Sequence, residues 1–193
     1  MDATDATTND ADLPLPIPLP RSAQAAMLSH MEDNAALLFE DLLRSATRFQ
    51  EDGTTLADAK GMTGEDLETL YEMGFGLFQD EAWRDALTVF IHLAAHNPFD
   101  IRFPFAAGMC FQQLDDALAA TVAYSQALML DSARADIAFR LGEALADIGQ
   151  TPQAQSILAV ALELIGENYD RYHHLQDPAE ELLLALESAS SAA

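Results

Sequence analysis

Apolar residues recur at helical spacing along most of this chain. Between residues 29 and 52 they form a single stripe, and Ser29 with Glu32 three residues later matches the capping box that begins many helices. The pattern predicts an amphipathic N-terminal helix, which Gly53 ends, and a connector that runs to residue 66. The stripe consists of Met31, Ala35, Leu38, Leu42, Ala46 and Phe49.

From residue 67 onward the chain repeats itself every 34 residues. Small residues and large residues keep this spacing together: Gly74, Gly108 and Gly142; Ala86, Ala120 and Ala154; Phe90, Tyr124 and Leu158. Each period holds two helical patterns with a break between them, and the small residues let the helices approach closely. A 34-residue helix pair is the unit of the tetratricopeptide repeat (TPR).

The predicted fold is therefore all-α, a right-handed α-solenoid of three TPR repeats with an N-terminal amphipathic helix and a C-terminal capping helix. The repeats cover residues 67–100, 101–134 and 135–168. Within the first two repeats, Asp80 and Asp115 are predicted to be the N-caps of the second helices.

The two ends of the chain have a different pattern. Residues 1–28 are acidic and proline-rich, and residues 13–20 alternate proline with leucine or isoleucine, which prevents a helix and favours an extended chain. We expect a disordered arm there. At the other end, Asp177 and Pro178 begin a last helix within residues 169–187, which would cover the end of the solenoid, and residues 188–193 are expected to be a flexible tail.

Charge narrows the range of partners. The chain has 32 acidic and 9 basic residues, a formal net charge of −23, so neither nucleic acid nor an anionic membrane surface is an expected partner. Half of the residues are hydrophobic, which is enough for a buried core. The pattern of a signal peptide or a membrane span is absent from the sequence, and a single cysteine fits a reducing compartment, so we expect a cytoplasmic protein.

Catalytic and metal-binding patterns are not evident. His92 and His96 lie four residues apart, a spacing that can bind a metal, but no third ligand accompanies them in the sequence. Cys110 is interpreted as a small buried apolar residue. We therefore expect a protein that is not an enzyme and needs no metal and no cofactor.

Binding in a TPR solenoid takes place on the concave surface that the first helices line. The positions that face inward carry mostly aromatic side chains, which suit an extended apolar segment of a partner. Some of them could instead be core residues, and Arg102 could contact a ligand or form an ion pair with a neighbouring acid. The predicted groove residues are Tyr71, Phe75, Phe78, Arg102, Phe105, Met109 and Phe139.

Three stretches carry a resemblance to one family. They are Gly53-Thr54-Thr55-Leu56 followed by Lys60-Gly61-Met62, then Leu67-Glu68-Thr69-Leu70-Tyr71, and then Asp100-Ile101-Arg102-Phe103 with Gly108 and Cys110. Together they resemble the class II chaperones of bacterial type III secretion, the translocator chaperones of the LcrH/SycD type. The resemblance covers about residues 30–186.

This resemblance implies a cytoplasmic chaperone that binds hydrophobic, pore-forming translocator proteins in the groove and prevents their aggregation or premature association before secretion. Some relatives also act with a transcriptional regulator of the AraC type. The N-terminal stripe, Met31, Leu38, Leu42 and Phe49, would contact a client or a second chain of a homodimer, or else pack within its own chain. The alternative function is a general TPR scaffold or adaptor for other proteins.

The role of the proline-rich arm stays open at this point. The alternation of proline and leucine over residues 13–20 is similar in composition to the client segments of the family, so the arm could be a weak ligand of its own groove. The simpler interpretation, which such a composition favours, is a solubilising tail.

Overall fold

The structure is a computed structural model that describes residues 53–191. The predicted arm and the predicted N-terminal helix with its apolar stripe lie outside the described residues. The connector contains one short helix, α3 (Leu56–Ala59), which begins with a capping box between Thr55 and Asp58. Leu56 is buried, as expected for the large apolar anchor of this segment.

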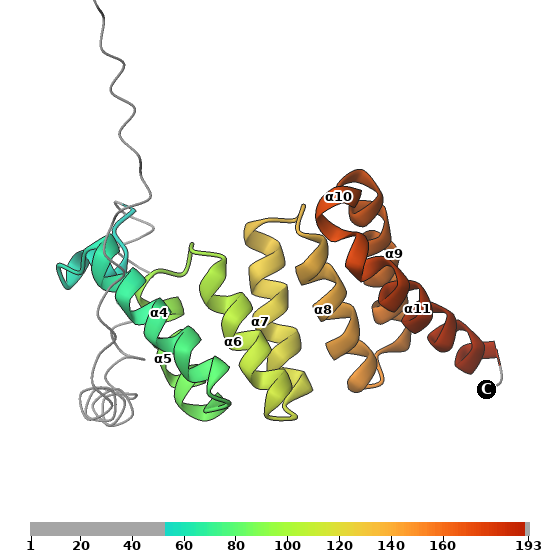
Figure 1. The fold of residues 1–193 in the computed structure, drawn as a ribbon, viewed down its shortest axis with the longest axis horizontal. Coiled ribbons are helices and arrows are strands. Elements are labelled where there is room, and N and C mark those ends of the chain that lie inside the picture. The colour runs from blue at the N-terminus through green and yellow to red at the C-terminus, as the bar shows by residue number, and fades with distance from the viewer. Residues whose placement is uncertain (1–52, 192–193) are drawn as a thin grey trace, which may run out of the picture.

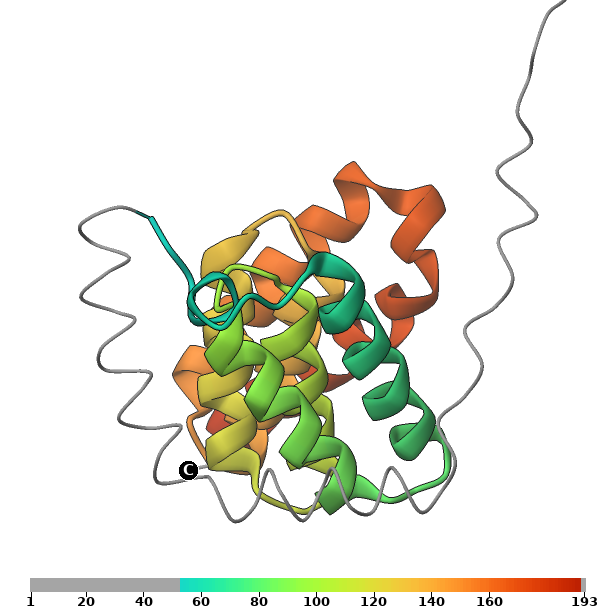
Figure 2. The ribbon, with the colours of Figure 1, turned by 90° about the vertical axis from the view of Figure 1, so that its left-hand side faces the viewer.

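Three antiparallel helix pairs follow the connector and stack in a row (Figure 1). Each helix packs against the one before it and the one after it, so the contacts run in chain order. The pairs are α4 (Gly64–Gln79) with α5 (Trp83–His96), α6 (Arg102–Gln113) with α7 (Ala117–Leu130), and α8 (Ala135–Asp147) with α9 (Thr151–Glu167). Figure 2 shows the same row from the end where α4 and α5 lie.

The residues that keep the 34-residue spacing meet inside each pair. A Cβ atom added to Gly74 would lie 2.8 Å from the Phe90 ring, and one added to Gly108 would lie 2.5 Å from the Tyr124 ring. Gly142 stands against Leu158 in the same way, at 2.7 Å. The glycine therefore lets the second helix of each repeat bring its large side chain against the first helix, which is why these two series share one period.

The turn inside each repeat has the same backbone geometry. Glu81, Asp115 and Gly149 lie 34 residues apart and adopt positive φ values of 61°, 59° and 74°. The predicted caps at Asp80 and Asp115 are wrong. Asp80 ends α4, and the N-cap of α7 is Asp116, whose carboxylate accepts a hydrogen bond from the Ala119 N–H. The second helix begins later than predicted because a residue with positive φ occupies one position of each turn.

The C-terminal end of the row is closed by more helix. A short helix α10 (Tyr169–Tyr172) and a 3-10 turn η1 (His173–Leu175) lead into α11 (Gln176–Ser191), which packs on α9. Tyr172 and Ala179 are buried in the same cluster as Leu158 and Ile165 of α9. The capping helix thus lies where it was predicted, but it continues through Ser191, so the prediction of a flexible tail is wrong for residues 188–191.

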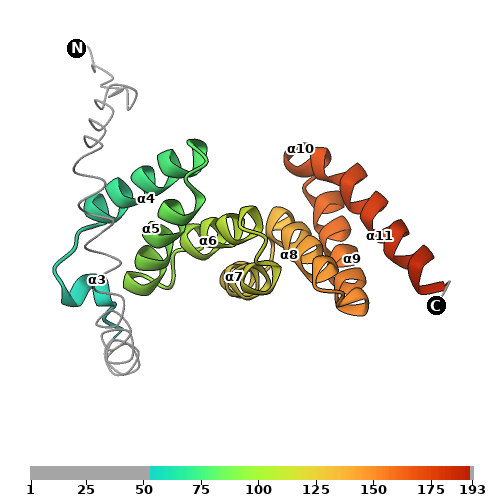
Figure 3. The same cartoon turned by 90° about the horizontal axis from the view of Figure 1, so that it is seen from below.

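The row of helices is curved. Seen from below, α4, α6 and α8 lie on its inner side, and α5, α7 and α9 lie on its outer side (Figure 3). Among residues 53–191, no helix combines the length and the apolar character needed to cross a membrane.

Candidate functional site

Aromatic side chains recur along α4, a helix of the inner side, at about one-turn spacing. Tyr71 and Phe78 are partly buried, and their rings pack on Phe90 and Trp83 at centroid distances of 5.8 and 4.8 Å. Phe75 lies between them and keeps 46% of its surface exposed. It is therefore the aromatic side chain of this helix that is most available to a partner.

The next inner helix, α6, continues this apolar strip. Phe105 and Met109 are partly buried against the core cluster of the second repeat, and the Phe105 ring lies 5.8 Å from the ring of Tyr124. The guanidinium of Arg134 lies 5.9 Å from the Phe105 centroid on the side of the third repeat. We call the predicted groove residues that α4 and α6 carry the inner aromatic row, because both helices lie on the inner side of the curve; it consists of Tyr71, Phe75, Phe78, Phe105 and Met109.

Phe139 does not extend this row as predicted. Only 5% of its surface is exposed, and it belongs to the core cluster that α8 forms with α9. The sequence pattern predicts an inward position for it, but its ring is buried in the cluster that Leu158 and Ile165 of α9 and Ala179 of α11 complete. The expectation that it offers an exposed contact surface is therefore wrong.

Arg102 is held by neighbouring acids. Its Nε and Nη2 donate to the Asp100 carboxylate, with Nη2–Oδ2 at 2.8 Å, and its Nη1 donates to Glu68 of α4 at 2.9 Å. The guanidinium carbon also lies 4.8 Å from the centroid of the Tyr71 ring. Of the two roles considered from the sequence, the structure shows the ion pair, in which Arg102 joins the first two repeats and supports one face of Tyr71.

The pKa values of Asp100 and Tyr71 are shifted in opposite directions. Burial raises the pKa of Asp100, but the hydrogen bonds and charge of Arg102 outweigh it and hold the pKa below its ordinary value. The pKa of Tyr71 is raised, chiefly by burial. Near neutral pH the Asp100 carboxyl is therefore ionised and paired with Arg102, whereas the Tyr71 hydroxyl is neutral.

The third repeat carries two ion pairs at α8. Arg134 donates to Asp136 at 2.6 Å, and Arg140 donates to Glu143 at 2.9 Å. The sequence reasoning considered only Arg102 as a basic residue on this surface and missed these two. The spacing of Arg140 and Glu143 along one helix could have indicated their pairing. Ion pairs thus lie at α8, whereas α4 and α6 carry most of the aromatic residues predicted for the groove.

The described residues contain no cluster that suggests metal chemistry. Across residues 53–191, no three His, Cys, Asp or Glu side chains come together as a metal site would require. His92 and His96 stack at 6.2 Å, and the Nδ1 atom of each lies within hydrogen-bond distance of the carbonyl four residues earlier. Cys110 is fully buried, and burial raises the pKa of its thiol to about 12.

Comparison with curated proteins identifies relatives in Yersinia. No family model matches the chain. The low calcium response locus protein H of Yersinia pestis and that of Yersinia pseudotuberculosis are each 30% identical to it over 119 residues, which is 62% of this chain and 71% of the relative. The matched length thus covers more than two thirds of each relative.

Solved structures agree with this relationship. The type III secretion translocator chaperone SycD of Yersinia enterocolitica has a TM-score of 0.64 at 28% identity, over 67% of this chain and 89% of SycD. A chain of a type III secretion complex from Aeromonas hydrophila has a TM-score of 0.71 at 25% identity, over 77% of this chain and 98% of that chain. These similarities confirm the predicted TPR fold. The chain belongs to the class II translocator chaperones of type III secretion, the LcrH/SycD family.

Proposed function

We propose that this protein is a cytoplasmic chaperone that binds hydrophobic, pore-forming translocator proteins of a type III secretion system through the inner aromatic row. Bound clients would be kept from aggregating or associating before secretion. The observation that carries the proposal is the half-exposed Phe75 on α4, with the partly buried Tyr71 and Phe78 one turn away on the same helix.

Related structures support a translocator as the client. SycD has been solved in complex with a peptide of the translocator YopD; that structure has 28% identity and a TM-score of 0.63 to this chain. PcrH has been solved with the chaperone-binding regions of PopD and of PopB. Transfer of this activity to the present protein rests on family membership together with the apolar character of its own inner side.

The chemistry of the row suits an extended segment with apolar side chains. Phe75 offers an exposed ring, whereas Tyr71 and Phe105 offer edges of rings that the core already holds in place. A surface whose rings are fixed loses little conformational entropy on binding. Binding of this kind needs no nucleotide, because the chaperone acts by mass action on the unfolded or partly folded client.

The ion pairs indicate where a client segment can place its apolar side chains. Arg102 is occupied by Glu68 and Asp100, so it supports Tyr71 and is a poor partner for a client acid. At α8 the ion pairs of Arg134 and Arg140 replace the aromatic rings. We expect apolar anchors of the client opposite α4 and α6, with a more polar stretch opposite α8. The predicted AraC-type regulator and the predicted homodimer stay predictions.

The test is co-expression with a candidate translocator, a secreted protein with paired hydrophobic segments. Phe75→Glu places a charge in the middle of the row, and we expect it to reduce client recovery about tenfold or more, because an anchor ring is typically worth one to a few kcal/mol. Phe99→Glu is the matched control, since Phe99 is 48% exposed against 46% for Phe75 and lies in the loop between α5 and α6.

Both variants are expected to fold, because each changes a half-exposed ring. Wild type and Phe99→Glu should keep the client soluble and co-purify with it. If Phe75→Glu retains the client as well as wild type does, the inner aromatic row is not the binding surface. If wild type retains no translocator at all, the chaperone function itself is refuted.

A further inference from the structure

The second helix of the middle repeat, α7, carries large apolar residues on two opposite sides. Its fourteen residues include no charged side chain, although 21% of the whole chain is charged. One side of the helix is in the core, where Ala120 and Tyr124 are fully buried. The opposite side leaves Leu118, Val122 and Met129 exposed, with 65% of the Val122 surface open to solvent. Large apolar residues exposed together in this way usually mark a surface that another segment or protein covers.

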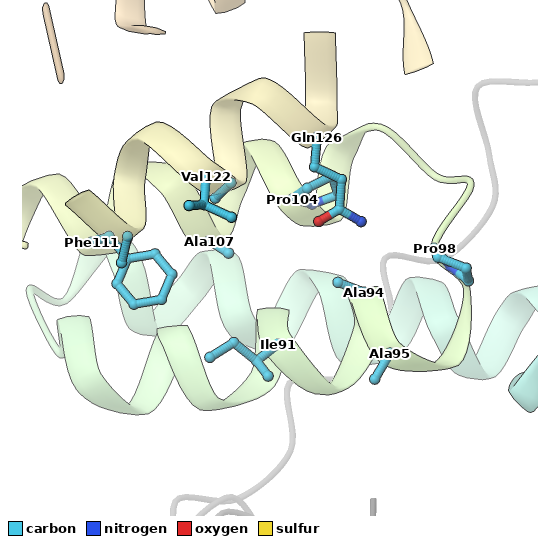
Figure 4. Close-up of a pocket in the computed structure, with 11 residues that line it drawn as sticks. Ile91, Ala94, Ala95, Pro98, Pro104, Ala107, Phe111, Val122 and Gln126 are labelled. Carbon is cyan, nitrogen blue, oxygen red and sulfur yellow. The ribbon is translucent and has the colours of Figure 1, made fainter. Parts of the chain in front are cut away.

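A groove lies beside this exposed side. It has a volume of about 440 Å³ and lies between α5 and α7, with α6 as its floor. Figure 4 shows Ile91 of α5 and Val122 of α7 on its two walls, and Phe111 of α6 at one end. Among the described residues that line it, Gln126 is the one polar side chain. We call this the outer groove.

The outer groove is distinct from the inner aromatic row. Both use α6, but the row uses Phe105 and Met109, whereas the floor of the groove uses Pro104, Ala107 and Phe111. In a helix with 3.6 residues per turn, these two sets fall on different sides. A partner in the outer groove would therefore not compete directly with a client on the inner side.

The chain leads from its N-terminal part directly to this side of the molecule. The first described helix, α3, packs on α5, and Leu56 and Ala57 are buried there (Figure 3). The preceding residues 29–52 carry the apolar stripe, with Phe49 only four residues before Gly53. Four residues can span up to about 14 Å, whereas packed helices lie about 8–10 Å apart. The stripe can therefore reach the groove next to α5 within its own chain.

We propose that the apolar stripe of residues 29–52 docks as a helix into the outer groove of the same chain. As a helix, 24 residues would extend about 36 Å, enough to cover the apolar sides of both α5 and α7. An amphipathic helix in an apolar groove is a common mode of recognition. The short tether gives the segment an effective concentration in the millimolar range, which favours its own groove over that of a second copy.

Disulfide trapping in the full chain tests this proposal. Leu42→Cys lies in the middle of the stripe and Val122→Cys lies on the wall of the groove. The native Cys110 does not interfere, because it is fully buried and burial raises the pKa of its thiol to about 12. Under mild oxidation we expect a disulfide within one chain, seen as a faster-migrating monomer on a non-reducing gel, with a yield that does not depend on protein concentration.

The matched control pairs Leu42→Cys with Leu184→Cys. Leu184 is 64% exposed, close to the 65% of Val122, but it lies on α11 at the other end of the row. We expect at least tenfold less cross-linked monomer from this pair. A disulfide-linked dimer whose yield rises with concentration would overturn the proposal in favour of a second copy in the groove. Equal yields from the two pairs, or no disulfide in either, would also overturn it.

Hydrogen exchange provides an independent measurement without cysteines. Val122→Asp alters an exposed side chain, so the repeats should remain folded, and the charge should drive the stripe out of the groove. We expect amide exchange in residues 31–49 to speed up at least tenfold, whereas Leu184→Asp leaves it unchanged. Exchange that is the same in wild type and Val122→Asp would refute the docking.

Discussion

Gly108 offers the sharpest test of how the 34-residue period is encoded. A Cβ atom at this position would lie 2.5 Å from Cε1 and 2.6 Å from Cδ1 of Tyr124. Carbon atoms in contact prefer about 3.5–4.0 Å, so Gly108→Ala forces the ring to withdraw by about 1 Å. Tyr124 is fully buried, and its hydroxyl donates a hydrogen bond to Gln112, so the ring has no free space to enter.

The expected magnitude follows from two opposing effects. Overpacking a core usually costs about 1–3 kcal/mol, and the overlap with several ring atoms places this site near the upper end. Alanine regains about 1 kcal/mol in helix propensity over glycine. We expect Gly108→Ala to lower the free energy of unfolding by about 2 kcal/mol. Gly76→Ala is the matched control, because Gly76 is also helical and a Cβ there meets nothing within 4 Å; it should stabilise by about 0.5–1 kcal/mol.

The assay is urea denaturation followed by circular dichroism at 222 nm, with all variants in the full chain. A double-mutant cycle with Tyr124→Ala identifies the cause, because the clash disappears once the ring is removed. Adding Gly108→Ala to Tyr124→Ala should then cost nothing or stabilise the protein. The reasoning fails if Gly108→Ala is as stable as wild type, or if its cost is unchanged in the Tyr124→Ala background.

Two further predictions concern ionisable groups. Burial raises the pKa of the Cys110 thiol to about 12, so the thiolate fraction at pH 8 is roughly a thousandfold below that of an exposed thiol. A thiol-reactive dye should therefore label the native protein far more slowly than the protein unfolded in guanidinium. Similar labelling rates in the two states would contradict this prediction. Burial raises the pKa of Asp136, but hydrogen bonds and the charge of Arg134 outweigh it and hold the pKa below its ordinary value. The ion pair therefore stabilises the fold above about pH 4, and this stabilisation is lost as the pH falls through the lowered pKa. The stability difference between wild type and Asp136→Asn should therefore be largest near pH 7 and shrink towards pH 3 in urea titrations, whereas a difference that does not change with pH would refute the role of the ion pair.

Local spacing was enough to predict the helix pairs. Each of Gly74, Gly108 and Gly142 faces a large side chain of the next helix. The glycine and its large partner keep the same separation along the chain in every repeat, so the sequence shows the pair as a periodic pattern. The cap positions were harder to predict. Asp80 and Asp115 are residues that favour caps, but the turn places a left-handed residue at Glu81 and Asp115, and sequence composition does not determine which position takes that conformation.

Exposure of individual side chains depended on neighbours that are distant in sequence. Phe75 and Phe139 both occupy inward positions of their repeats, yet one is half-exposed and the other is buried, because Phe139 packs on the cluster that α9 and the C-terminal helices complete. Asp100 is a local partner of the Arg102 guanidinium, but Glu68 and Tyr71 reach it only when two repeats stack.

The sequence alone therefore determined the helical repeat and its period, because both depend on residues at fixed separations along one helix pair, and its connector and repeat entries carried the resemblance to the family. The tertiary structure decided which aromatic rings stay accessible, which charges are neutralised and where an apolar groove is left on the outer side. These properties depend on how much area each neighbouring helix covers, and that area is set by the stacking and curvature of the whole row.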